Sequence, residues 1–458
     1  MSAVVLVERR RAKLQAELRS LDVEFKHWKK LTTDQPELRR HHSQVRRLDA
    51  TIAGLLEPLT QQLSGPGTSS DDILLKGQDW ENEILAAHSI WEVFRAKLLL
   101  REDPVFREHL AACDDFAWAC YQPAQTHFAK QRREPPLVYF SATWSPFALS
   151  RDANFQNEIR AGSGTAGWLA EDDFQAVLAR LPIPLLSIPW YQVAHLPAAL
   201  ILAHEVGHLV AADFGLEATI RELLDRANLD HVDLWKQWWS EVFADLYGCV
   251  TVGPAFLGAL MDLLASSAAL VQQEDKRSGS YPSRALRVEL GLGALEQMGR
   301  SADAVRLRTD WEKLYGPIQK MTELLPEVPK VITALLAGPY EGLALNQIIT
   351  FDFADYSIPG KLARAGSPLN ASQRDPRLLF AAARWLHENE PSAPALQKAC
   401  DLLRQHLVLS APKEFRFRGE PKPDPGQFEA LLSAQEKEDR AAGLDLRAQL
   451  FPATAPGP

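Results

Sequence analysis

The sequence is poor in cysteine and has no excess of positive charge. It contains four cysteines in 458 residues, and no two of them have the C-x-x-C spacing of a redox or zinc motif. They are Cys113, Cys120, Cys249 and Cys400. A disulfide framework is therefore not expected, because such frameworks belong to small, cysteine-dense secreted domains. The net charge of −9 argues against nucleic-acid binding, which requires a basic face.

Long apolar runs are rare as well. Near the N-terminus, the charged residues Glu8–Arg11 stand where a signal peptide would need an apolar stretch, so we expect a cytoplasmic protein. Cys249–Val271 is long enough to span a membrane, but it carries Asp262 and is interrupted at Gly253-Pro254. A charge near the centre of a bilayer costs about 2.5–3.5 kcal/mol. We therefore predict a buried helix there and no membrane association.

What remains is the composition of a large globular protein, with 46% hydrophobic and 24% charged residues. A chain of 458 residues exceeds one compact core and should form several domains. Helical periodicity dominates, with two short β-type runs between residues 136 and 190. We expect a mainly helical α+β protein with four regions: a helical hairpin (1–63), a helical connector (73–135), a core with a small sheet (136–300) and a C-terminal helical region (301–450).

The N-terminal region contains a heptad repeat of apolar residues. One series occupies Leu14–Trp28 with alternating spacings of four and three, and a second series occupies Leu38–Leu59. Between them, Asp34 as a helix N-cap and Glu37 three residues later predict that a second helix starts at this point. Two apolar seams joined by a short turn form an antiparallel helical hairpin. We expect the hairpin to serve packing, self-association or the binding of a protein partner.

The central motif is the segment His204–His208, which reads H-E-V-G-H and matches the pattern H-E-x-x-H. It lies in Pro197–Ala212, a segment that we expect to be one helix, with Gly215 beyond its end. Positions i and i+4 share a helix face, so both imidazoles can reach one metal ion. Glu205 lies beside them, where it can take a proton from a metal-activated water. The alternative is a helix whose two histidines have no shared role.

A second helix downstream supplies further acids. Glu241 and Asp245 are four residues apart, and therefore on one face, within the apolar stretch Trp235–Val250. Burying two carboxylates is costly unless each finds a cation or a hydrogen-bond donor. Glu241 as the third metal ligand, and Asp245 as the partner of the His204 ring N–H, would satisfy both. The alternative is an ion pair with an arginine.

The pair of motifs H-E-x-x-H and E-x-x-A-D resembles the gluzincin zinc metallopeptidases. The Glu-x-x-Ala-Asp form is similar to the family of the CAAX prenyl proteases and their bacterial heat-shock relatives. In the gap between the motifs, and in its lack of membrane spans, the chain also resembles the ImmA/IrrE-like zinc peptidases. The resemblance covers residues 185–290. It implies a zinc-peptidase core with one Zn²⁺ per chain on His204, His208 and Glu241, and with Glu205 as general base.

Tyr281-Pro282-Ser283-Arg284 extends the resemblance. The CAAX prenyl protease family often carries a His-Pro pair followed by an arginine in this region, and here a tyrosine stands in place of the histidine. A peptidase needs a donor that faces the oxyanion of the transition state. Tyr281, Arg284 and His231 are the candidates for that donor, and the sequence does not choose among them.

Leu185–Ile188 is predicted to be a short strand just before the active-site helix. In similar peptidases an edge strand at this place binds the substrate backbone by strand addition. A purely structural strand is an equal alternative.

Together these features predict a zinc-dependent endopeptidase that acts on a protein or peptide substrate. Glu205 would take a proton from the activated water and return it to the leaving amine. The rival is a regulatory or scaffold protein that keeps a structural or vestigial zinc site and works through its helical flanks. Glu205 favours the enzyme, because a structural site would not need a base between its two histidines.

Overall fold

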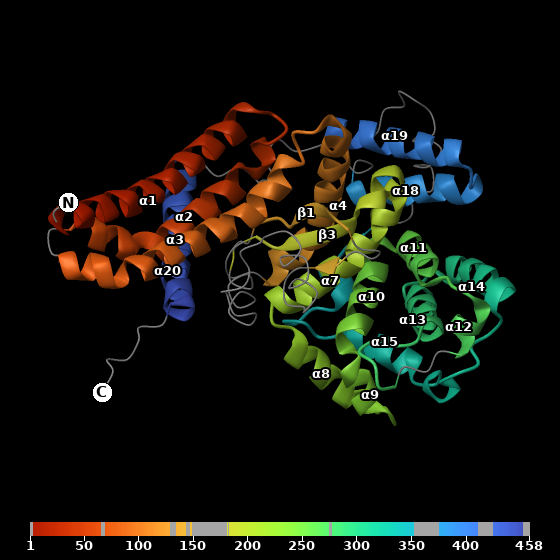
Figure 1. Ribbon diagram of the computed structural model, residues 1–458. Coiled ribbons are helices and arrows are strands. Elements are labelled where there is room, and N and C mark those ends of the chain that lie inside the picture. Colours follow the sequence, from red (N-terminus) through yellow and green to blue (C-terminus); the bar gives the residue numbers. More distant parts are fainter. Residues whose placement is uncertain are drawn as a thin grey trace. The chain divides into compact units, whose positions relative to one another are not determined.

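The computed structural model describes most of the chain. The described residues are 3–65, 69–128, 134–142, 147–148, 181, 183–273, 277–351, 375–410 and 425–451. Helices account for most of them, and one small sheet is present (Figure 1). The predicted mainly helical α+β class is therefore confirmed.

Contacts between residues divide the chain into two compact units. The first unit comprises Met1–Arg107, Arg151–Ile183 and Pro412–Pro458, and the second comprises Glu108–Ser150 and Pro184–Ala411. This division differs from the four predicted regions. The predicted connector is shared between the two units, and the predicted C-terminal region contributes its last helix to the first unit.

Four long helices build the first unit: α1 (Ala3–Asp34), α2 (His42–Ser64), α3 (Ser70–Leu99) and α20 (Pro425–Leu450). Helices α1 and α2 form an antiparallel hairpin, because Gln15 donates to the Leu63 carbonyl at 2.9 Å while Lys29, further along α1, pairs with Asp49. Most residues of the two apolar series are buried. Helix α3 packs on both helices of the hairpin, and α20 packs on α2 (Figure 1).

The crossing of α2 and α20 depends on two glycines. A Cβ added to Gly54 would lie 2.1 Å from the carbonyl oxygen of Arg440, and one added to Gly443 would lie 2.0 Å from that of Thr51. No side chain tolerates such distances to backbone atoms, so glycine alone lets the two helices come this close. A glycine inside a helix costs roughly 1 kcal/mol relative to alanine, which the close packing must offset.

The turn between α1 and α2 differs from the prediction. Asp34 is the last residue of α1, and a short 3₁₀ helix, η1 (Arg39–His41), precedes α2, which begins at His42. The predicted helix start at Asp34 is therefore wrong. Helix α1 continues to this point because Thr32 satisfies its hydroxyl inside the helix, donating to the Trp28 carbonyl at 2.8 Å.

The second unit contains a three-stranded sheet in the order β1-β3-β2. Strands β1 (Leu137–Ser141) and β3 (Leu185–Pro189) pair in parallel, while β2 (Phe147–Ala148) pairs with β3 antiparallel. The strand predicted at Leu185–Ile188 is thus confirmed as β3. It is the central strand, however, so the expectation of an edge strand at this place is wrong; β1 and β2 are the outer strands of the described sheet.

Helices form the rest of the second unit. Helix α4 (Pro104–Phe128) enters it from the first unit. The α-helices that follow are α7 (Leu202–Asp213), α8 (Glu217–Arg226), α9 (Val232–Gln237), α10 (Trp239–Val252), α11 (Pro254–Leu264), α12 (Ala268–Gln273), α13 (Arg284–Gln297), α14 (Ser301–Tyr315), α15 (Val328–Ala337), α16 (Leu345–Ile348), α18 (Pro376–Asn389) and α19 (Ala393–Ser410). The 3₁₀ helices are η2 (Trp190–Ala194), η3 (Leu196–Ile201) and η4 (Thr322–Leu324). Helix α7 packs against β2, β3 and α10.

The apolar segment Cys249–Val271 is not one continuous helix. Helix α10 ends at Val252, Gly253 has a positive φ of 69°, and Pro254 begins α11. Among the described residues, one helical segment has the length and apolar composition of a membrane span: Leu196–Asp213, with a mean hydropathy of 1.2. Since 78% of that segment is buried inside the protein, it has the character of a core helix.

Candidate metal centre

Helix α7 carries both histidines of the H-E-x-x-H motif. The predicted helix Pro197–Ala212 is present to within one residue at each end, but its first part is the 3₁₀ helix η3 and the α-helix α7 starts only at Leu202. His195 caps the 3₁₀ segment, because its Nδ1 accepts a hydrogen bond from the backbone of Ala198 at 3.1 Å. The rigid, buried helix fixes His204 and His208 one turn apart on one face.

Helix α10 brings the acids. The sequence predicted one helix through the apolar stretch Trp235–Val250, whereas the structure divides that stretch between α9 and α10, which are separated at Trp238. This break places Glu241 in the first turn of α10, where the positive end of the helix dipole favours a carboxylate. Asp245 follows one turn later and is fully buried.

Small residues let the two helices touch. A Cβ added to Gly207 would lie 2.9 Å from the Cα of Ala244 and 3.0 Å from the Cβ of Tyr247. A side chain at position 207 would therefore push α10 away from α7. Gly207, a variable position of H-E-x-x-H, and Ala244 of E-x-x-A-D thus allow the close packing that holds the histidines of α7 within reach of Glu241.

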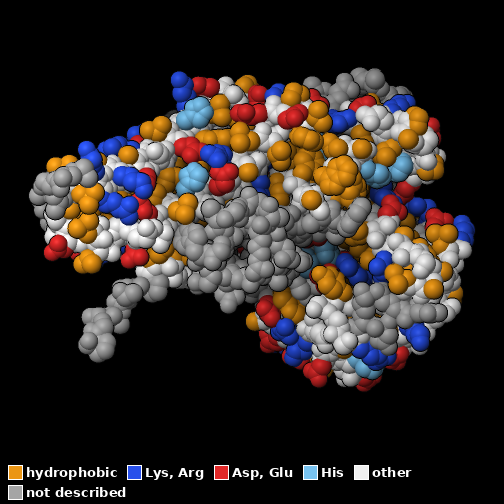
Figure 2. All heavy atoms as spheres, in the orientation of Figure 1, with side chains coloured by type: hydrophobic (Ala, Val, Ile, Leu, Met, Phe, Trp, Pro, Cys, Tyr) orange, Lys and Arg blue, Asp and Glu red, His pale blue; other side chains and the backbone are white. Residues whose placement is uncertain are grey.

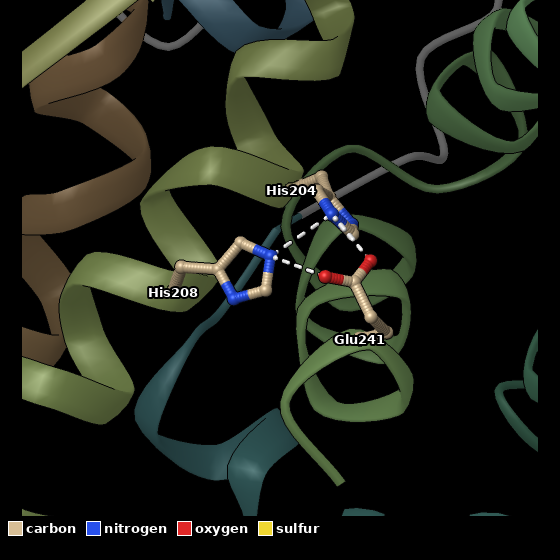
Figure 3. Close-up of side chains that lie close together, drawn as sticks. All are labelled: His204, His208 and Glu241. Carbon is tan, nitrogen blue, oxygen red and sulfur yellow. Dashed lines mark hydrogen bonds and ion pairs between the residues drawn. The ribbon is translucent and has the colours of Figure 1, made fainter. Parts of the chain in front are cut away.

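The ligand atoms of His204, His208 and Glu241 converge on one point (Figure 3). The two Nε2 atoms are 3.1 Å apart, and each lies 3.3 Å from an oxygen of Glu241, Oε2 for His204 and Oε1 for His208. Tetrahedral ligands at 2.0–2.1 Å from a zinc ion are separated by about 3.3 Å. These three residues form a group that could hold a metal ion.

The pKa shifts of His204 and Glu241 fit a group that holds a cation at its centre. Burial lowers the pKa of His204, but Asp245 and Glu241 outweigh it and raise that pKa to about 10. Burial raises the pKa of Glu241, but the two histidines outweigh it and hold that pKa well below its ordinary value. Glu241 Oε2 is buried and accepts no hydrogen bond from the described residues. A metal ion would satisfy this oxygen and replace the proton that His204 otherwise holds.

Two further residues orient the imidazoles. His204 Nδ1 lies 2.9 Å from Oδ1 of Asp245, an ion-pair contact that is too oblique for a good hydrogen bond. His208 Nδ1 lies 2.9 Å from the hydroxyl of Ser240. Both contacts occupy the outer ring nitrogen and leave Nε2 directed at the centre, which is how supporting groups hold metal-ligating histidines. Asp245 thus lies where the sequence predicted, and Ser240 was not foreseen.

Arg287 on α13 is the main residue that the sequence analysis missed. Its Nε and one terminal nitrogen donate to Asp245 at 2.7 and 2.8 Å, and the same terminal nitrogen lies 3.6 Å from Glu241. Burial raises the pKa of Asp245, but the charge of Arg287 outweighs it and the pKa is lowered. The two partners considered for Asp245, a ligand histidine and an arginine, are therefore both present.

The proposed base and oxyanion donors lie in different surroundings. Glu205 is buried on α7 between the two histidines, with 6% of its surface exposed. Arg284 donates to the carbonyl of Leu264 at 3.1 Å, and His231 pairs with Glu327 at 2.7 Å. Tyr281 is 46% exposed. The choice among the three candidate donors therefore stays open.

No family model, curated protein or solved structure matches the chain significantly. The similarity to the gluzincins therefore depends on the motif residues, and nothing in these comparisons tests it. The functional conclusion must come from the geometry of the centre on α7, α10 and α13.

Proposed function

We propose that the chain is a zinc-dependent endopeptidase whose metal ligands are His204, His208 and Glu241. The observation that supports this most is the convergence of two imidazole Nε2 atoms and one carboxylate at separations of 3.1–3.3 Å. Three protein ligands on a tetrahedral ion leave a fourth position for water, which is the ligand set of catalytic zinc sites.

The donor set favours zinc over other divalent ions. Two neutral imidazoles and one carboxylate suit Zn²⁺, whereas Ca²⁺ and Mg²⁺ prefer oxygen ligands and higher coordination numbers. Asp245 and Ser240 occupy the outer nitrogens of the two rings. Arg287 neutralises Asp245, so a divalent ion would balance the negative charges of Glu241 and Glu205.

Glu205 would act first as general base and then as general acid. When bound, zinc would supply a Lewis acid that lowers the pKa of a coordinated water toward about 7. Glu205 would accept the proton from the attacking water and deliver it to the nitrogen of the leaving amine as the peptide C–N bond breaks. A structural metal site would have no need of a buried carboxylate between its two histidine ligands, so Glu205 supports an enzyme over the rival scaffold function.

The substrate would be a protein or peptide, bound in the cytoplasm. Because β3 is the central strand, strand addition would have to use an outer strand of the sheet instead. Of the two outer strands, β2 is the one that packs against α7. A partner or a second copy binding through the N-terminal hairpin stays a prediction.

Elemental analysis tests the proposal most directly. Purified protein should contain about one zinc per chain, and a chelator should remove both the zinc and the cleavage of substrates found by a proteolysis screen. Restored cleavage after zinc is added back is the expected control result. A protein that takes up no zinc when supplied with it would contradict the proposal.

A further inference from the structure

We propose that the first unit binds a small phosphorylated ligand in a basic pocket at the turn between α1 and α2. The pocket has a volume of about 430 Å³, which is within the range of small-molecule sites, about 300–1,000 Å³. It is lined by α1, η1, α2 and α20, and all of its described lining residues belong to the first unit. The metal centre belongs to the second unit, so this proposal does not depend on the peptidase function.

The pocket concentrates positive charge. Its described lining includes Lys29, Arg39, Arg40, Arg46, Arg47 and Arg440. The acids of the lining are Asp49, Glu436 and Asp439. Six cations against three acids leave an excess of three positive charges, in a chain whose net charge is −9. Figure 2 shows basic and acidic side chains interspersed on one face of the protein.

Each acid of the pocket already has a cation. Asp49 pairs with Lys29, Asp439 receives hydrogen bonds from Arg47 at 2.8–3.2 Å, and Glu436 lies 3.5 Å from Arg440. The acids of the described lining are thus neutralised within the pocket, and neither Arg39 nor Arg46 is needed to balance them.

The proposed ligand site depends mainly on two arginine side chains, Arg46 and Arg39. Arg46 is half-buried and makes no ion pair or hydrogen bond with any described residue. Arg39 is exposed and has one long contact, 3.4 Å to the carbonyl oxygen of Thr33. A guanidinium group without a partner binds phosphate oxygens with two parallel hydrogen bonds, which a point charge such as ammonium cannot do. A partly buried free guanidinium is costly without an anion.

The start of α2 adds a further positive pole. His42 and Ser43, the first two residues of this 23-residue helix, line the pocket, and the preceding His41 gives no side-chain cap. A helix N-terminus carries roughly half a positive charge and is a common phosphate site. The hydroxyls of Thr33 and Ser43 line the same space and can donate to phosphate oxygens. Three excess charges, the unpaired guanidinium group of Arg46, the weakly bonded one of Arg39 and a helix N-terminus suit a ligand with two or more negative charges.

Calorimetric titration of the full-length protein with inorganic pyrophosphate tests the proposal. We expect one site per chain with a Kd in the micromolar range, on the order of 1–100 µM, that weakens as salt is added. Arg46→Glu should weaken binding at least tenfold. Arg19→Glu on α1 makes the same change of net charge at an exposed residue outside the pocket lining, and it should leave the Kd unchanged. Arg46→Gln introduces no acid and should weaken binding by an intermediate factor. It serves as the test if the charge reversal in Arg46→Glu disturbs folding.

Three results would overturn the proposal. The first is the absence of saturable pyrophosphate binding up to about 1 mM, which corresponds to only about −4 kcal/mol. The second is an equal loss in the Arg46→Glu and Arg19→Glu proteins, since that indicates general attraction rather than a site. The third is a single-stranded oligonucleotide that binds more tightly than pyrophosphate. Zinc content should be unchanged in every variant, so failure here leaves the peptidase proposal untouched.

Discussion

Arg287 donates two hydrogen bonds to Asp245, at 2.7 and 2.8 Å, and both side chains are buried. The same carboxylate lies 2.9 Å from His204 Nδ1. Asp245 therefore connects Arg287 on α13 to His204 on α7, and we expect it to influence both stability and metal affinity. These two effects can be separated by experiment.

Replacing Asp245 with alanine should affect both properties. Metal affinity should fall about 10–100-fold, because the outer nitrogen of His204 loses its partner. Stability should fall by about 3–5 kcal/mol, because Arg287 is left as a buried, unpaired charge. Denaturant titration and zinc competition measure the two separately. The double variant Asp245→Ala/Arg287→Met should regain stability but not affinity; a double variant as unstable as the single one would show that the ion pair is not the cause.

Gly207→Ala should weaken the metal site through packing alone. The added Cβ would meet the Cα of Ala244 at 2.9 Å, and a backbone atom cannot rotate away. We expect α10 to be displaced and zinc affinity to fall at least tenfold. Gly293→Ala on α13 is the matched control, because its Cβ would come close only to side-chain atoms: the flexible terminal methyl of Ile332 at 2.7 Å and a Val328 methyl at an ordinary 3.7 Å. Equal zinc affinity in both alanine variants, by competition titration, would contradict this account.

Glu205→Gln separates the enzyme from a scaffold with a structural zinc. Glutamine keeps the shape of the side chain but cannot accept a proton at neutral pH. The variant should bind about one zinc, unfold near the wild-type temperature and lose cleavage or the associated cellular effect. His204→Ala should lose both metal and activity. A Glu205→Gln protein with full activity would rule out the proposed base.

His109 should make the stability of the protein depend on pH. Burial and the charge of Arg404 lower its pKa from 6.5 to about 3, and neither ring nitrogen has a hydrogen-bond partner among the described residues. Below pH 6.5 the unfolded chain therefore takes up a proton that the folded chain does not. The free energy of unfolding that comes from keeping His109 neutral is therefore fully present above pH 6.5. It is lost as the pH falls from 6.5 toward 3.

His109→Phe removes this proton and keeps a ring next to Phe140, whose centroid lies 5.4 Å away. Relative to wild type, the variant should gain about 1.4 kcal/mol per pH unit as the pH falls from 6 to 4. Urea denaturation at several pH values measures the difference, and pH 8 serves as the reference. A difference that is constant from pH 8 to pH 4 would show that His109 is not buried as a neutral base.

The three ligand residues could be predicted because their positions follow from helix geometry. His204 and His208 are one turn apart whatever surrounds the helix, and Asp245 bears the same relation to Glu241. Arg287 could not be predicted, because its contact with Asp245 depends on how α13 packs across α10. The sequence analysis considered an arginine as the partner of Asp245 but named none. It singled out Arg284, three residues earlier, as a candidate oxyanion donor, and that residue bonds the Leu264 carbonyl.

The two incorrect predictions about the fold, for β3 and for the start of α2, have similar causes. The central position of β3 depends on β2, which has only two residues and no periodicity that a sequence pattern could show. The start of α2 was misplaced because Asp34 and Glu37 have the spacing of a capping box, while the contacts of Thr32 keep α1 helical up to Asp34. Local capping patterns were outweighed by bonds within the preceding helix.

The glycine crossing of α2 and α20 has a consequence for the order of folding. The face of α2 around Gly54 is covered by a helix that is synthesised more than 300 residues later, after the second unit. During synthesis that apolar face therefore stays uncovered until α20 has been made. Closing so long a loop adds little further entropic cost, since that cost grows only with the logarithm of length. The first unit is thus completed only after the second unit has been synthesised, although α1, α2 and α3 precede the second unit in the chain.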